Sequence, residues 1–76
     1  MTLTEIAARI NAHLARLERD ARINVNGMYY RPSAYRLGPR VHVRYISYQG
    51  AQLLTRAEAT AYLAWLDAGN VGRWRA

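Results

Sequence analysis

Three side chains that can carry positive charge occupy alternate positions in the short segment RVHVR. They are Arg40, His42 and Arg44. On a β-strand, alternate side chains share one face and lie about 6.6 Å apart. Arg donates two parallel hydrogen bonds to an anion, and protonated His supplies a further donor. A cationic row of this spacing is suited to contacts along a phosphate backbone.

The net positive charge of the chain comes from its middle segment. The sequence has 11 Arg and no Lys against five acidic residues, which gives a net charge of +6. Acids balance the Arg residues in each of the segments 1–20 and 58–76, whereas residues 21–57 hold six Arg, five of the six Tyr and no acid. A one-sided basic field with aromatic residues among the cations is typical of nucleic-acid-binding proteins.

We therefore predict a nucleic-acid-binding surface on a sheet face, in which Arg36 on a neighbouring strand widens the cationic row into a patch. The alternative is a solvated face that is basic for solubility and to prevent edge pairing, although such faces usually mix both signs. The tail at 73–75 either packs onto the last helix or acts as a contact arm. The predicted contact residues are Arg31, Arg36, Arg40, His42, Arg44 and Arg56, with Arg73, Trp74 and Arg75 in the arm.

The tyrosines of the middle segment admit two roles. Because the chain has no Phe, some of them are needed for the core, where Tyr places its hydroxyl at the rim. The others can stack on bases or form a protein-binding patch. The five residues are Tyr29, Tyr30, Tyr35, Tyr45 and Tyr48.

The sequence offers no recognisable catalytic centre. Cys is absent, which excludes disulfides and thiolate metal sites. His13 and His42 lie on different predicted elements, and no sequence pattern brings a carboxylate beside either. We expect His13 to lie at the margin of an apolar helix face. The interpretation is a protein that is not an enzyme and needs no metal or cofactor.

Two helices are predicted from their first turns and their apolar spacing. Thr2 with Glu5, and Thr55 with Glu58, have the spacing of capping boxes. Apolar residues at three- and four-residue steps predict a first helix over about 3–20 and a second that follows Thr55. The expected core positions are Leu3, Ile6, Ala7, Ile10, Leu14, Leu17 and Ala21, then Ala59, Tyr62, Leu63 and Leu66.

Between the helices the period changes to two, which favours strands. Pro32 lacks the amide that a ladder requires, so MYYRPSAYRL is predicted to be an edge or bulged strand. Gly38-Pro39 leads into a strand over 40–48, and Gln49-Gly50 into a short strand over 51–54. In the strand over 40–48, Val and Tyr at 41, 43 and 45 should face the core.

The order of elements predicts an α+β fold, with a helix, a two- or three-stranded antiparallel sheet and a second helix, both helices packing on one face. The cluster from Asn24 to Gly27 predicts a turn before the sheet.

We expect a single domain over 1–76 and, given its small core, consider a homodimer. An acidic start and the short apolar run AYLAWL indicate a soluble, cytoplasmic protein without a membrane partner.

Residues 40–68 resemble the arm-type DNA-binding domain of tyrosine integrases. That family has a strand, a tight Gly turn, a second strand and a helix that begins Thr-x-Ala-Glu-Ala. It lays its sheet in the DNA major groove, and the resemblance implies the contacting role for Arg40, His42 and Arg44. The family usually carries cations where AQLL stands here. The matching residues are RVHVRYISYQGAQLL, then Thr55, Arg56, Ala57, Glu58, Ala59, Tyr62 and Leu63.

Two further resemblances are weaker, and they leave the same two hypotheses for the function. The element order is similar to that of the double-stranded-RNA-binding domain, which places several Lys where only Arg56 stands here. The ending is similar to small uncharacterised proteins of actinobacterial phages, which implies no mechanism. The leading hypothesis is a non-enzymatic nucleic-acid-binding module for duplex DNA. The alternative is an inhibitor or adaptor that binds an acidic host or defence protein, because Arg and Tyr are also enriched at interface hot spots.

Overall fold

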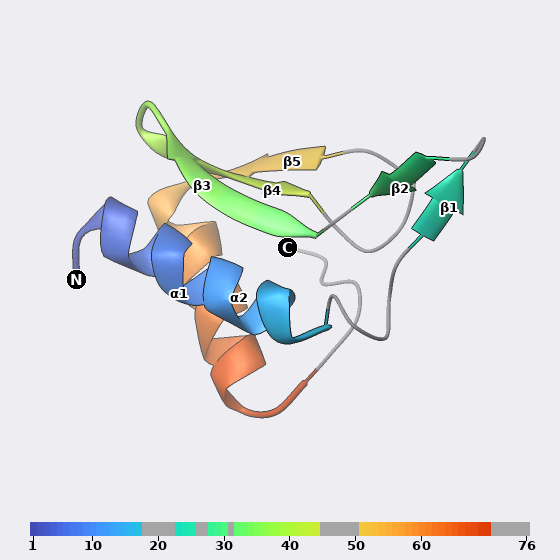
Figure 1. Ribbon diagram of the computed structural model, residues 1–76. Coiled ribbons are helices and arrows are strands. Elements are labelled where there is room, and N and C mark those ends of the chain that lie inside the picture. Colours follow the sequence, from blue (N-terminus) through green and yellow to red (C-terminus); the bar gives the residue numbers. More distant parts are fainter. Residues whose placement is uncertain (18–22, 26–27, 31, 45–50, 71–76) are drawn as a thin grey trace.

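The computed structural model describes residues 1–17, 23–25, 28–30, 32–44 and 51–70. Figure 1 shows a sheet of three strands as one layer and both helices as a second layer against one of its faces. The predicted α+β fold is therefore confirmed. The elements are α1 (Leu3–Leu17), β1 (Ile23–Val25), β2 (Met28–Tyr30), β3 (Ser33–Leu37), β4 (Arg40–Arg44), β5 (Ala51–Leu54) and α2 (Arg56–Asp67).

Both helices begin with the predicted capping boxes. The Thr2 amide donates to Glu5 Oε1 at 3.0 Å, and the Glu5 amide donates to the Thr2 hydroxyl at 3.1 Å. The same exchange joins Thr55 and Glu58 at 2.9 and 3.2 Å. The backbone amides that donate to Glu5 and Glu58 lower the pKa of both carboxyls. Gly69, with φ of 93°, lies just beyond the end of α2 in the left-handed region.

The core fills the space between the helices and one face of the sheet. Each described residue predicted to lie in it is buried, apart from Leu3, which is partly buried. Ala21 and the side chain of Leu17 lie outside the described residues. The buried set is Ile6, Ala7, Ile10 and Leu14 from α1, Ala34, Val41, Val43 and Leu54 from the sheet, and Ala59, Tyr62, Leu63 and Leu66 from α2.

The three-stranded sheet is antiparallel, in the order β3-β4-β5. A turn at Gly38, with φ of 59°, connects β3 to β4 and pairs Leu37 with Arg40. β3 is an edge strand, as predicted. Asn11 of α1 accepts a hydrogen bond from the Ala34 amide at 3.0 Å, so a helix side chain satisfies a backbone donor of this edge strand.

The segment before the sheet differs from the prediction. MYYRPSAYRL is split into β2 and β3, with Pro32 between them, because proline cannot continue a ladder. β2 pairs with β1 in a separate two-stranded sheet. The turn expected from Asn24 is wrong at Asn24 and Val25, where alternation with Ile23 and pairing to β2 favour a strand. Residues 18–20, the predicted strand end at 45–48 and the turn at 49–50 lie outside the described residues.

Candidate functional site

Strand β4 presents alternate side chains to the two faces of the sheet, as predicted. Val41 and Val43 are fully buried against the helices. Arg40 and Arg44 are exposed on the opposite face, and His42 between them is half-buried. The helices cover only one face, so β4 carries its cations on the face that they leave open (Figure 1).

The register of the sheet determines which residues join these cations, because directly paired residues share a face. Tyr35 of β3 pairs with His42, and His42 pairs with Leu53 of β5, so these three form a row across the sheet. Arg40 and Arg44 lie on either side of that row along β4. We call this surface the open face: Ser33, Tyr35, Leu37, Arg40, His42, Arg44, Ala51 and Leu53.

The open face is partly apolar. The exposed fractions are 49% for Tyr35, 48% for Leu37 and 48% for Leu53. A sheet face whose only role is contact with solvent would carry polar side chains at these three positions. Large apolar side chains that lie together at the surface are typical of a binding site. Leu37 and Leu53 were not among the residues predicted to bind.

An aromatic pair lies at the middle of the open face. The rings of Tyr35 and His42 are stacked, with centroids 4.7 Å apart and planes inclined by 25°. His42 Nδ1 is buried and has no hydrogen-bond partner among the residues that the structure describes. Ring packing, rather than a hydrogen bond at Nδ1, therefore orients His42. The half-exposed ring of Tyr35 makes this pair accessible from solvent.

No carboxylate side chain lies on any strand, because all five strands fall within the acid-free segment 21–57. Among the described residues, Arg40 enters no ion pair. The hydrogen bonds from Thr55 first, and then the positive charge of Arg40, lower the pKa of Glu58. Within the part of the chain that the structure describes, the guanidinium of Arg40 thus forms no salt bridge with a carboxylate.

Arg36 does not belong to the open face, and the prediction that it widens the cationic row is wrong. It is the cross-strand partner of Val41, so it lies on the helix side of the sheet. Its guanidinium donates to the Gly38 carbonyl at 3.0 Å and to the Thr4 hydroxyl at 3.4 Å. The sequence indicated this placement. A two-residue turn at Gly38-Pro39 pairs Leu37 with Arg40 on one face of the sheet, so Arg36, one residue earlier, lies on the opposite face.

The remaining predicted contact residues lie apart from the open face or cannot be placed. Arg56 is in the first turn of α2 and donates to the backbone carbonyl of Met1, so it belongs to the helix layer. Arg31, Arg73, Trp74 and Arg75 lie outside the described residues. Of the predicted set, the structure brings together Arg40, His42 and Arg44.

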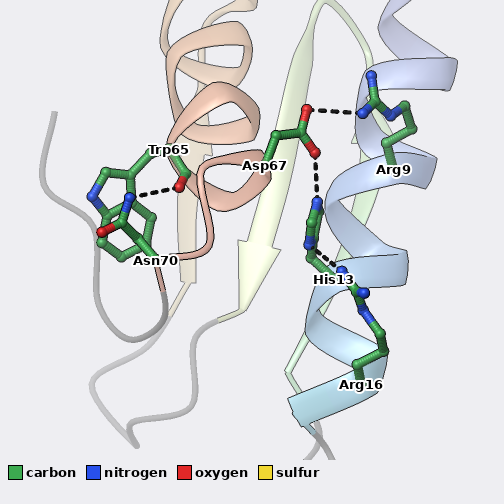
Figure 2. Close-up of polar contacts among 6 residues, drawn as sticks. All are labelled: Arg9, His13, Arg16, Trp65, Asp67 and Asn70. Carbon is green, nitrogen blue, oxygen red and sulfur yellow. Dashed lines mark hydrogen bonds and ion pairs between the residues drawn. The ribbon is translucent and has the colours of Figure 1, made fainter.

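A second polar cluster joins the two helices (Figure 2). Asp67 of α2 accepts hydrogen bonds from Arg9 at 2.8 Å and from His13 Nε2 at 2.7 Å. Arg16 Nη2 lies 2.6 Å from His13 Nδ1. Arg can only donate, so Nδ1 accepts and Nε2 carries the proton that is donated to Asp67. We call Arg9, His13, Arg16 and Asp67 the interhelical clasp.

The clasp corrects the expectation that no carboxylate lies beside His13. Asp67 is 54 residues away in the sequence and meets His13 only because α1 and α2 pack side by side. Both ring nitrogens of His13 are occupied, by Asp67 and by Arg16, so neither is available to a substrate proton. The arrangement is that of a structural connection between helices.

Replacing Asp67 by Asn should weaken the dependence of stability on acid pH. The hydrogen bond from His13, together with the nearby Arg9, holds the pKa of Asp67 below its ordinary value. A carboxyl with a lowered folded-state pKa stabilises the fold fully above its unfolded pKa of about 3.9, and this contribution is lost as the pH falls through the folded value. We expect Asp67→Asn to be less stable than the wild type at pH 7, with a smaller further loss below pH 4, in thermal unfolding followed by circular dichroism.

A matched variant separates the carboxylate from the amide that replaces it. Ala61→Asn places the same side chain on an exposed position of α2 away from the clasp and should keep the wild-type pH profile. If Asp67→Asn and the wild type lose stability in parallel as the pH falls, the clasp does not stabilise the fold.

The described residues form neither a metal site nor a membrane-spanning helix. No group of three or more His, Asp or Glu side chains in the described part of the chain is arranged to hold a metal ion. Among the same residues, neither helix has the length and apolar character needed to cross a membrane. Comparison of the chain with protein-family models, curated proteins and solved structures gives no match.

Proposed function

We propose that the protein is a non-enzymatic module that binds nucleic acid through the open face. The observation that supports this most strongly is the placement of Arg40 and Arg44 on either side of a stacked aromatic pair, on a sheet without carboxylates. Cations that lie in line with aromatic rings are the combination that proteins use to hold a phosphate backbone and the bases attached to it.

The spacing of the two arginines supports contact with more than one phosphate. Arg40 and Arg44 are four residues apart on one strand, which corresponds to about 13 Å between their backbone positions. Each guanidinium can donate two parallel hydrogen bonds to one phosphate. His42 lies between them and adds a third charge when it is protonated. The open face therefore offers two or three phosphate contacts.

Salt dependence tests this proposal. Each neutralised phosphate contributes about −0.7 to −0.9 to the slope of log affinity against log salt concentration, so two or three contacts predict a slope of about −1.5 to −3. Fluorescence anisotropy of labelled duplex and single-stranded oligonucleotides, at salt concentrations from about 20 to 300 mM, measures it. Absence of binding to both probes at the lowest salt concentration would contradict the proposal.

Duplex DNA is the form of nucleic acid implied by the resemblance to the arm-type domain, and it stays a prediction.

The alternative function, an adaptor or inhibitor that binds a protein, is favoured by the half-exposed Tyr35, Leu37 and Leu53, because aromatic and apolar side chains beside Arg are typical of protein interfaces. Purification of the tagged protein with and without nuclease separates the two. A stoichiometric protein partner that survives digestion would favour the alternative, and light scattering tests the homodimer.

A further inference from the structure

We infer that the open face binds an unpaired nucleic-acid strand, with a base on the ring of Tyr35 and the adjoining phosphates against Arg40 and Arg44. This inference rests on the proposed function and specifies its substrate. The cations alone do not distinguish a single strand from a duplex. The inference therefore depends on the stacked rings of Tyr35 and His42, which lie between the two arginines.

The centre of the open face is suited to the flat surface of a base. Tyr35 is 49% exposed and is oriented by its stack on His42, and Leu53, on the other side of His42, is 48% exposed. The row is therefore aromatic and apolar across all three strands. Every base has a π-face, so stacking on such a surface needs no particular sequence.

A duplex would use this surface less completely. In a duplex the faces of the bases are covered by their neighbours, and a protein reaches only base edges, which it reads mainly with hydrogen-bonding side chains. Leu37 and Leu53 have no hydrogen-bonding side-chain atom, and they are the cross-strand partners of Arg40 and His42. A duplex would gain the phosphate contacts and at most apolar contacts with thymine methyl groups, whereas a single strand would also gain the stacking.

Charge complementarity distinguishes a polyanion from a second copy of this chain. A symmetric dimer through the open face would place Arg40 and Arg44 of one copy opposite the same basic surface of the other. No strand carries an acid that could compensate, because all strands of the described residues lie in the acid-free segment 21–57. Like charges that face each other across an interface disfavour association. A single strand brings the opposite charge to the same surface.

Two variants of one residue test the inference. Tyr35→Leu keeps an apolar side chain but removes the π-face, and Tyr35→Phe keeps the ring. The probes are a fluorescein-labelled oligothymidine of about 12 nucleotides and a duplex of the same length, both at low salt concentration. We expect Tyr35→Leu to weaken binding of the single strand by about 5- to 150-fold, the range for loss of one base–aromatic contact. Tyr35→Phe should stay within about twofold of the wild type.

The duplex probe and the salt slope keep the outcomes distinct. Tyr35→Leu should change duplex binding by less than about twofold and leave the salt slope unchanged, because no charge is removed. Equal single-strand affinity for Tyr35→Leu and the wild type, with binding still sensitive to salt, overturns the inference and leaves the proposed function intact. Failure of the wild type to bind either probe overturns both the inference and the proposed function. Both are also overturned if a second copy of the chain or an acidic protein is found to occupy the open face.

Discussion

Replacing Arg40 and Arg44 together by Ala should weaken binding to every nucleic-acid probe by about 100-fold. A hydrogen bond to a charged group contributes roughly 1.5 to 3 kcal/mol, so the loss of each phosphate contact costs about tenfold or more in affinity. Because phosphate contacts carry no sequence information, the loss should be the same for different sequences. The salt slope should also become shallower by about 1.4 to 1.8. Anisotropy titrations of the double variant measure both quantities.

A variant with the same change in net charge provides the control. Arg36→Ala with Arg56→Ala also removes two positive charges, one from the helix side of β3 and one from the first turn of α2, and leaves the interhelical clasp intact. It should bind within about threefold of the wild type, since only long-range attraction changes. Arg36→Ala alone, which removes one charge from the helix side of the sheet, should change affinity even less. Equal losses in the two double variants would show that net charge, rather than the open face, determines affinity.

Replacing Tyr62 by Ala should be the most damaging single change to the fold. Tyr62 has no exposed surface, lies at the centre of the face of α2 that packs in the core, and stacks on Trp65 with ring centroids 6.1 Å apart. Truncation of a buried aromatic residue to Ala costs about 3 to 5 kcal/mol. At about 0.05 to 0.15 kcal/mol per residue, a chain of 76 residues has a free energy of unfolding of about 4 to 11 kcal/mol, so this change should remove a large part of its stability.

Urea unfolding followed by circular dichroism measures this loss. Tyr35→Ala is the matched control, because it removes the same side chain from a position that is about half exposed. The control should cost less than half as much as Tyr62→Ala, since the lost contact area is smaller. Similar losses for the two variants would contradict the assignment of Tyr62 to the core and Tyr35 to the surface.

The helices were predictable from local sequence patterns. The strands that differ from the prediction depend on pairing between segments of the chain. Both capping boxes and the period of the apolar residues located the helices, because these features depend on neighbours within one turn. Strand β1 was not predicted, because Asn24 favours turns locally and only pairing with β2 makes the segment a strand. The division between β2 and β3 follows from the missing amide of Pro32, which the sequence showed, although its consequence for the two sheets depends on tertiary structure.

The candidate site was predictable in part. Alternation within β4 correctly placed Arg40, His42 and Arg44 on one face, since period two is a property of a single strand. The contribution of the neighbouring strands depends on register, which alternation within one strand does not specify, so Leu37 and Leu53 were missed. Arg36 was assigned to the wrong face although the two-residue turn at Gly38-Pro39 indicated its register. The interhelical clasp could not be predicted, because no local pattern relates His13 to a carboxylate 54 positions away.

The most direct test of binding through the open face is an NMR titration of the isotope-labelled protein with the single-stranded oligothymidine. We expect the largest amide shift changes at Tyr35, His42 and Leu53 and at the flanking Arg40 and Arg44. The amides of Ala15 and Ala61, on the exposed sides of α1 and α2, should stay unchanged. Shift changes that concentrate on the helices, with β3, β4 and β5 unaffected, would contradict binding through this face.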